Sequence, residues 1–427
     1  MVMGTMSMES TLTAETGPLG PEDRQQIEKV RPIPRISIQA FCETEAVAKP
    51  IERVGSDRRM SKAHLKVQMG GIKAASEHFQ SAPTPNLVIL ESRLSPLDLL
   101  TELELLADVC DPGSKVVIIG HYNDVPLYRD LMHRGISEYL VAPVSVGDVM
   151  TVIGELFASE GVEPLGRSIA FVGAKGGVGS STIAHNVAWS ISKLFSTDVV
   201  LADLDLAFGT ANINFDQDPT QGMAEALQSA ERIDDVYLDR LLAQCAEHLS
   251  LLAAPSVLDR TYDFEGDAFN ALIETAQRGA PAVLLDVPHL WNEWTRTVLA
   301  RADQVVITAV PDLANLRNAK NLVDTLAKMR PNDAPPYLIL NQLAMPKRPE
   351  ISAAEFSEPL GLEPLGEIQF DPAIFGNAAN SGRMIAETDV KHASVPVFNH
   401  VAHVLTGRGE AKKAKKPSLL GRLRMKS

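Results

Sequence analysis

The sequence predicts an α/β protein of two doubly wound, parallel-sheet domains, and three observations carry this prediction. Short apolar runs alternate with helical patterns from about residue 34 to residue 158, which is typical of a parallel sheet. The same alternation resumes after residue 166, beginning with a glycine-rich turn. A short segment, GVEPLGR, separates the two regions. The expected segments are a disordered leader (1–31), a first domain (32–160), a linker (161–167), a second domain (168–407) and a tail (408–427).

The composition is that of an ordinary globular protein, with 427 residues, 45% of them apolar and 22% charged. The net charge of -14 argues against nucleic-acid binding by the whole molecule. The 3 cysteines are far apart and odd in number, which argues against a disulfide framework or a zinc site. No apolar run approaches the ~18 residues of a membrane span, and the N-terminus lacks a signal-peptide pattern. We therefore expect a cytoplasmic protein.

The first domain follows a leader that carries few large apolar residues and no sustained period. Its expected strands are RISIQAF (35–41), NLVILES (86–92), KVVIIGH (115–121) and EYLVAP (138–143). A long polar and helical stretch precedes the second of these strands. Further helices are expected at 97–109, 125–135 and 146–157.

The order of these elements resembles a response-regulator receiver domain, which is flavodoxin-like, over about residues 34–158. Where that family closes its third strand with a phosphoaccepting aspartate, this chain has Glu91. Where the family has a lysine before a proline, this chain has Ala142, and the paired acids after the first strand are displaced to Glu43 and Glu45. The resemblance implies a pseudo-receiver used for dimerisation or docking. The alternative is an unrelated flavodoxin-like domain, because fold does not fix function.

The second domain is organised around residues 170–191, where an apolar strand ending at Val172 meets a glycine-rich turn and a helical pattern. The glycines let the backbone turn tightly, and the N–H groups at the helix start attract an anion. The strict P-loop spelling fails at Ala174 and at Ser180, which stands where a lysine is expected. The residues predicted to bind the nucleotide phosphates are Lys175, Gly176, Gly177, Val178, Gly179, Ser180, Ser181 and Thr182.

Acidic side chains follow two later apolar strands. A strand at 199–202 ends in Asp203 and Asp205, whose spacing by two places both on the same side of the chain. A strand in PAVLLDVPHL ends at Asp286, in the form of a Walker B strand whose acid holds magnesium through water. This pattern suits magnesium together with an acid that positions water.

The remaining part of the second domain offers few candidate functional residues. Residues 219–280 are expected to be mostly helical, with YLDRLLAQCAEHL (237–249) as a clear amphipathic piece. Two more strands, QVVITAVPD and YLILNQL, follow, and the second carries Asn341. Asn341 is a candidate to bond a purine edge; the alternative is that it only turns the chain out of the strand. The last expected helix is VPVFNHVAHVL (395–405).

The second domain resembles the deviant Walker A ATPases of the ParA/MinD type over about residues 166–406. The motifs that carry the resemblance are AKGGVGSST, DLDLAFG, LLDVPHL, TAVPD, ILNQL and GEIQFD…NAANSGR, in this order. The resemblance implies ATP and Mg²⁺ as cofactors and an ATP-sandwiched homodimer, in which Lys175 reaches the partner's nucleotide. It also implies that Ser181 ligates magnesium, Asp205 positions the attacking water, and Asp286 lies behind the metal. From its place at the strand end, two residues before Asp205, Asp203 is counted with the metal-side acids.

The arrangement of a degenerate receiver followed by this ATPase domain resembles the TadZ/CpaE family, which localises the assembly machinery of Flp (tight adherence) pili. The resemblance implies a regulator, placed at the cell pole, that recruits the secretion ATPase and other pilus components. Ser180 removes a positive charge from the phosphate site, so we expect ATP binding to survive more readily than hydrolysis. The expected behaviour is a slow switch or a nucleotide-stabilised scaffold.

The tail combines basic residues with a short apolar face between Lys412 and Met425. Division-site ATPases of the same superfamily end similarly, and the resemblance implies weak contact with the inner membrane. The alternative is a solvated basic end that improves solubility. Two other functions stay open: a partitioning ATPase for another cargo such as nucleoid DNA, and a signalling module driven by receiver phosphorylation, which Glu91 and Ala142 disfavour.

Overall fold

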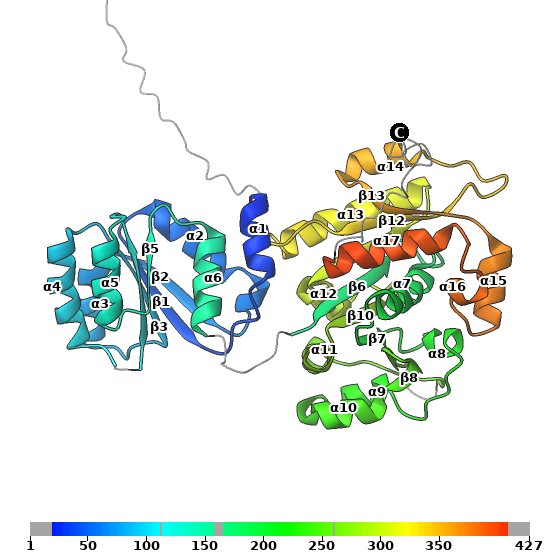
Figure 1. The fold of residues 1–427 in the computed structure, drawn as a ribbon, viewed down its shortest axis with the longest axis horizontal. Helices are drawn as coiled ribbons and strands as arrows, with labels where there is room; N and C mark the ends of the chain where they lie inside the picture. Colours follow the sequence, from blue (N-terminus) through cyan, green and yellow to red (C-terminus); the bar gives the residue numbers. More distant parts are fainter. Residues whose placement is uncertain (1–18, 112, 158–164, 259–260, 409–427) are drawn as a thin grey trace, which may run out of the picture. The chain divides into compact units, whose positions relative to one another are not determined.

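The structure is a computed structural model that describes residues 19–111, 113–157, 165–258 and 261–408 (Figure 1). The chain divides into two compact units. The first comprises Met1–Ser159 with Arg330–Asp333, and the second comprises Glu160–Met329 with Ala334–Ser427. Each unit contains a sheet built mainly of parallel strands, so the predicted α/β class is confirmed. None of the described helices is long and apolar enough to span a membrane.

The first unit is a 5-stranded, fully parallel sheet in the order β2-β1-β3-β4-β5. Its strands are β1 (Ser37–Cys42), β2 (His64–Met69), β3 (Leu87–Ser92), β4 (Lys115–Gly120) and β5 (Glu138–Val141). Its helices are α1 (Pro21–Glu28), α2 (Glu45–Gly55), η1 (Arg58–Met60), α3 (Gly71–Phe79), α4 (Pro96–Ala107), α5 (Val125–His133) and α6 (Val146–Leu156). Apolar side chains of α1, α2 and α6 pack on one face and those of α3, α4 and α5 on the other (Figure 1).

Two elements of the first unit differ from the sequence prediction. Strand β2 was included in a polar, helical stretch because its side chains are half-buried or exposed and give no apolar run. It pairs only with β1, at the edge of the sheet. The disordered leader was predicted to extend to residue 31, and this is wrong for its described part, which contains α1. Ile27 of α1 is fully buried in the core that includes α6, and Asp23 accepts a hydrogen bond from the Gly147 N–H (3.3 Å). Residues 1–18 lie outside the described residues.

The second unit is an 8-stranded sheet in the order β13-β12-β11-β6-β10-β7-β9-β8, in which only β8 runs antiparallel to its neighbour. Its strands are β6 (Arg167–Gly173), β7 (Val199–Asp203), β8 (Ala243–Ala246), β9 (Leu249–Leu252), β10 (Ala282–Val287), β11 (Gln304–Ala309), β12 (Tyr337–Leu343) and β13 (Pro364–Gln369). Its helices are α7 (Ser180–Phe195), α8 (Ala211–Asn214), α9 (Met223–Gln228), η2 (Ala230–Arg232), α10 (Asp235–Leu241), α11 (Gly266–Gly279), α12 (Glu293–Arg301), α13 (Leu313–Met329), α14 (Ala353–Ser357), η3 (Glu358–Leu360), α15 (Pro372–Asn380), α16 (Ile385–Thr388) and α17 (Ser394–Thr406).

Strand β6 lies near the middle of this sheet, between β11 and β10. Helices α7 and α17 cover one face of the sheet, and α11, α12 and α13 cover the other (Figure 1). Asp286 at the end of β10 is in register with Asp203 at the end of β7. The predicted phosphate turn and these acids therefore meet at the carboxyl edge of the sheet, where open α/β sheets bind ligands.

The predicted amphipathic helix over residues 237–249 is wrong. Helix α10 ends at Leu241, and the following residues form the antiparallel pair β8 and β9. Leu249, Leu251 and Leu252 of β9 are buried and Ser250 is half-buried, so the strand is a short, mostly buried apolar run. Pairing with β7 buries this short apolar run and overrides the local helical pattern.

Candidate functional site

The loop between β6 and α7 has the backbone conformation of a tight turn. Gly177 and Gly179 have φ angles of 79° and 87°, in the left-handed region that favours glycine. A Cβ atom at Gly179 would also lie 2.5 Å from Asn341 Nδ2. A side chain at Gly179 would therefore meet both an unfavourable backbone and a neighbouring amide.

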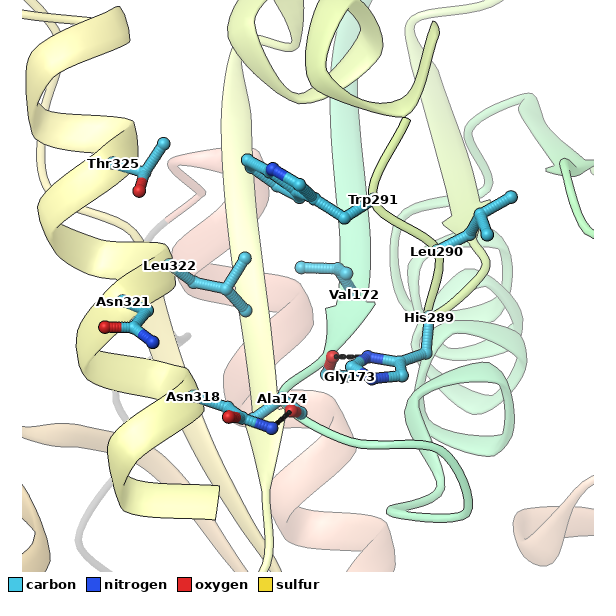
Figure 2. Close-up of a pocket in the computed structure, with 10 residues that line it drawn as sticks. All are labelled: Val172, Gly173, Ala174, His289, Leu290, Trp291, Asn318, Asn321, Leu322 and Thr325. Atoms are coloured by element: carbon cyan, nitrogen blue, oxygen red, sulfur yellow. Dashed lines mark hydrogen bonds between the residues drawn. The ribbon is translucent and has the colours of Figure 1, made fainter. Parts of the chain in front are cut away.

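Two side chains from other elements hold the first carbonyl groups of this loop (Figure 2). His289 Nδ1 lies 3.0 Å from the Gly173 carbonyl oxygen, and because that oxygen only accepts, Nδ1 is the donor. Asn318 of α13 donates from Nδ2 to the Ala174 carbonyl at 2.9 Å. These bonds fix the beginning of the loop against β10 and α13.

The end of β12 holds the last carbonyl groups of the loop. Asn341 Nδ2 donates to the Val178 carbonyl at 2.8 Å, and Gln342 Nε2 donates to the Gly177 carbonyl at 3.1 Å. Asn341 is thus placed beside the phosphate turn, and its contact with a purine stays a prediction.

The oxygen atoms of these four carbonyl groups point at protein side chains. The Ala174 N–H donates to the Thr308 carbonyl at 2.8 Å, and the N–H groups that follow in the loop are left to attract an anion. The sequence reading did not identify His289, Asn318 or Gln342. Asn318 and His289 are separated from their loop partners by 144 and 116 residues, so no local pattern indicates these roles.

Ser180 begins α7, and its hydroxyl oxygen is buried without a hydrogen-bond partner among the described residues. A buried hydroxyl group without a partner is unusual in a protein and suits a position that meets a ligand. Lys175 is exposed, and it makes no ion pair within the described part of the chain. Gly176 is exposed beside it, and Thr182 is half-buried in the first turn of α7. Lys175 is therefore the cation of this loop.

Ser181 and Asp286 form the central contact of the site. The Ser181 hydroxyl donates to Asp286 Oδ1 at 3.1 Å, and Asp286 is 4% exposed. Because the hydroxyl proton points at the carboxylate, the lone pairs of Ser181 Oγ remain for a cation. His185, one turn later on α7, was not identified from the sequence; its Nε2 lies 3.3 Å from Asp286 Oδ2.

Asp203 lies beside Asp286 and is fully buried. Its Oδ1 accepts from the Asp205 N–H and its Oδ2 from the Ala211 N–H, both at 3.1 Å. Burial and the nearby Asp286 carboxylate raise the pKa of Asp203 to about 7, against the opposing effects of His185 and the two N–H groups. Of the predicted metal-side groups, Asp203 is the deepest, and its role at a metal stays a prediction.

Asp205 lies in the turn after β7 and is half-buried. Its Oδ1 accepts a hydrogen bond from the Phe208 N–H at 3.1 Å. Burial raises the pKa of Asp205, the Phe208 N–H opposes this, and the Asp286 charge adds to the increase. A carboxylate at the exposed edge of the site with a pKa above its usual range is suited to accept a proton from water.

The residues present fit a magnesium ion held mainly by phosphate and water. In the described part of the chain, no cluster of three or more His, Cys, Asp or Glu side chains is arranged to hold a metal by itself. Mg²⁺ in nucleotide sites takes only one or two protein ligands and fills its other positions with water and phosphate oxygens. The Ser181 hydroxyl, already oriented by Asp286, is such a ligand.

A cavity of about 380 Å³ lies on the α13 side of the phosphate loop (Figure 2). Its walls are Val172, Gly173, Ala174, His289, Leu290, Trp291, Asn318, Asn321, Leu322 and Thr325. Two of these side chains, His289 and Asn318, are the tethers of the loop described above. Trp291 is 49% exposed at the cavity wall.

In the first unit, Glu91 occupies the crevice at the carboxyl ends of β1 and β3. Its fully buried carboxylate accepts from the Glu43 N–H (2.7 Å), the Thr44 N–H (2.8 Å) and the Thr44 hydroxyl (2.7 Å), and lies 3.1 Å from His121 Nε2. Burial alone would raise the pKa of Glu91, but these hydrogen bonds lower it, and the net direction is downward. The carboxylate is therefore fully engaged as an internal cap.

The chain is similar to known proteins, both over the segment that contains the site and over further parts of its length. A family model described as an AAA domain matches residues 166–336, which include the phosphate loop and the three acids. The flagellum site-determining protein YlxH of Helicobacter pylori is 26% identical over 196 residues, which are 42% of this chain and 60% of that protein. A ParA family ATPase from Chlorobium tepidum is 24% identical, with 55% and 98% of the two chains covered and a TM-score of 0.51, which shows a shared fold.

A solved structure of the pilus assembly protein CpaE from Caulobacter crescentus is 47% identical to this chain. The match covers 30% of this chain and 98% of that one, with a TM-score of 0.30. An identity of 47% over 98% of the CpaE chain indicates a common family. The chain belongs to the family of the CpaE pilus assembly proteins.

Proposed function

We propose that this protein is an ATP-binding, dimerising spatial regulator that localises and recruits the assembly and secretion machinery of Flp (tight adherence) pili. The observation that carries the proposal is the tethered phosphate loop with its Ser181–Asp286 pair. It is supported by the 47% identity to a CpaE pilus assembly protein over 30% of this chain. The partners are a second copy of the chain, the secretion ATPase and other pilus components.

The nucleotide would be held by the loop N–H groups at its phosphates, with Ser181 and Asp286 on the metal side. Magnesium, when bound, neutralises charge on the phosphate oxygens. Asp205 lies where it could orient a water molecule. Lys175 is exposed and its charge acts on Asp312 across the site, and it would reach the nucleotide of a partner subunit. These roles follow the predicted assignments of Lys175, Asp205, Ser181 and Asp286.

Ser180 makes hydrolysis the weaker part of the activity. A lysine at this position would place a positive charge on the phosphates in both the ground state and the transition state. Serine offers one neutral hydrogen bond, so binding through the loop N–H groups is retained and turnover is slow. The protein would then act as a nucleotide-stabilised scaffold or slow switch.

Dimerisation through Lys175 is tested by sedimentation of the full chain with ATP and Mg²⁺. The parent should form a dimer with ATP and revert to monomer with ADP, because only ATP presents a γ-phosphate to the partner's lysine. Lys175→Ala should bind ATP yet stay monomeric, and Lys193→Ala, on the last turn of α7, serves as the control for loss of a surface charge. A Lys175→Ala protein that dimerises like the parent would contradict the proposed role.

The tail between Lys412 and Met425 lies outside the described residues, and we propose that it gives the protein weak, reversible contact with the inner membrane. Each basic residue near an anionic leaflet adds about 1 kcal/mol of attraction. Deletion of residues 411–427 should abolish sedimentation with anionic liposomes. Unchanged sedimentation would show that the tail does not bind the membrane and would favour the alternative, a basic end that improves solubility.

The second candidate function is a ParA/MinD-like positioning ATPase for another cargo. The relative from Helicobacter pylori is named for flagellum site determination, which favours positioning as the shared activity. Nucleoid DNA as the track is disfavoured by the net charge of -14. ATP-dependent, salt-sensitive DNA binding by the full chain would revive this candidate.

A further inference from the structure

His185 lies next to the site without belonging to any motif identified above. It is 1% exposed and comes one helical turn after Ser181 on α7, so both side chains face the same strand end. Its Nε2 atom is 3.3 Å from Asp286 Oδ2, and its Nδ1 atom is 3.0 Å from Asn214 Nδ2. The imidazole therefore bridges β10 and α8.

The neighbours of the ring determine which nitrogen carries the proton. With its amide nitrogen toward the ring, Asn214 can only donate, so Nδ1 of His185 accepts and the proton is on Nε2, which faces Asp286. The Nε2 atom lies within ion-pair distance of Asp286 but has no aligned hydrogen bond among the described residues. Hydrogen bonds at such sites are often poorly aligned without a ligand and tighten when it binds.

A histidine at this place needs an explanation beyond packing. The ring packs against Phe215 with a centroid distance of 5.7 Å, in a core where an apolar side chain would avoid the cost of burying two polar nitrogens. Nε2 is instead directed at Asp286 and Nδ1 at Asn214. Asn214 ends α8, whose first residue, Ala211, binds Asp203 through its N–H at 3.1 Å.

We propose that His185 is a positioning residue for Asp286. Its Nε2–H faces Asp286 Oδ2 at 3.3 Å and would close onto it when nucleotide and magnesium bind. This contact would keep Oδ1 on the Ser181 hydroxyl and leave the Ser181 lone pairs oriented for the cation. The same ring fixes α8, and through it the segment that contains Asp203. This inference rests on the proposed binding of ATP with magnesium, and it assigns the residue that sets the geometry on the metal side.

The test compares ATP affinity with and without Mg²⁺, measured by titration of the full chain with a fluorescent ATP analogue. His185→Leu should lose roughly 10-fold in affinity with Mg²⁺, the size typical of removing an outer-shell partner. Affinity in EDTA should change less than about twofold, because the loop N–H groups are untouched. His185→Gln, which can donate to Asp286 from the same turn of helix, should recover most of the magnesium effect.

Val187→Ala is the matched control, since Val187 is a fully buried apolar residue of the same helix. It should lower the thermal midpoint and leave the magnesium effect unchanged, which separates positioning from loss of stability. The inference is overturned if folded His185→Leu keeps the full magnesium effect, or if His185→Leu and His185→Gln lose it equally. In either case the proposed function stands. If the parent itself shows no magnesium-dependent ATP binding, the proposed function fails, and the inference with it.

Discussion

Asp286 is the residue at which the contacts of the second unit converge. Ser181 donates to one of its oxygens, His185 faces the other, and its main-chain carbonyl accepts from the Leu204 N–H at 3.0 Å. Its charge is also a cause of the raised pKa of Asp203, after burial. A substitution at Asp286 should therefore alter the contacts of Ser181 and His185 and the pKa of Asp203.

Asp286→Asn removes the negative charge while keeping the size of the side chain. The pKa of Asp203 should fall from about 7, because a like charge no longer disfavours its ionised form, yet stay above its ordinary value because Asp203 is still buried. NMR titration of the carboxyl carbons measures this directly. A pKa of Asp203 that is unchanged in Asp286→Asn would contradict the pairing of the two acids.

Asn318 shows how a single amide supports the phosphate loop. Asn318→Ala removes the hydrogen bond to the Ala174 carbonyl and should weaken ATP binding by about 3- to 10-fold, as expected for one hydrogen bond of about 1 kcal/mol. Asn321→Ala is the matched control, since Asn321 lines the same cavity and no hydrogen bond of its side chain occurs among the described residues. Calorimetric titration that finds equal losses in both variants would argue against the tether.

At the scale of elements, Glu91 joins the ends of three strands in the first unit. It caps the turn between β1 and α2 through Glu43 and Thr44, and it contacts His121 after β4. The crevice in which an α/β sheet of this order would bind a ligand is therefore filled by the protein's own carboxylate. This arrangement supports a structural pseudo-receiver rather than a phosphoacceptor.

The pH dependence of the first unit follows from this carboxylate. The pKa of Glu91 is lower in the folded state than its usual 4.5, so its stabilisation is complete above that pH and is lost as the pH falls through the folded pKa. Glu91→Gln should remove this dependence and cost about 2–3 kcal/mol at pH 7. Amide hydrogen exchange of peptides from residues 37–60 measures it, with Glu43→Gln, whose side chain is exposed, as control. If Glu91→Gln loses protection at low pH as the parent does, the Glu91 carboxylate is not the cause of the pH dependence.

The elements that could be predicted from sequence are those whose signal is local. Strands β3 and β10 are continuous buried apolar runs, and the turn before α7 shows its glycines directly. Strands β2 and β8 lie at sheet edges, where partial exposure removes the apolar pattern. Strand β9, beside β8, is a buried apolar run of only 4 residues. Helix α1 buries only Ile27, so its sequence shows no helical repeat of apolar residues that would predict it.

The candidate site divides in the same way. Asp203, Asp205 and Asp286 could be predicted because each ends or follows an apolar strand, and parallel strand ends share one edge of a sheet. The tethers His289 and Asn318 and the bridge at His185 could not, because their roles depend on partners far away in sequence. Tertiary packing, rather than any motif, brings these groups together.

At the scale of the whole molecule, the chain joins a unit in which the Glu91 carboxylate is engaged by Glu43 and Thr44 to a unit whose phosphate loop has Ser180 in place of the usual lysine. Under the proposed function, switching belongs to the second unit, which contains the phosphate loop, and docking or dimerisation belongs to the first. Under the same proposal Ser180 makes the switch slow, because serine lacks the positive charge that would stabilise the phosphates during transfer.

The most direct test of this central claim is the equilibrium affinity of the full chain for ATP with Mg²⁺, measured for the parent and for Ser180→Lys. The parent should bind saturably below millimolar ATP, and Ser180→Lys should bind more tightly, because the added cation contacts the phosphates that the loop already holds. Absence of binding by the parent at millimolar ATP would contradict the claim that this protein is a nucleotide switch.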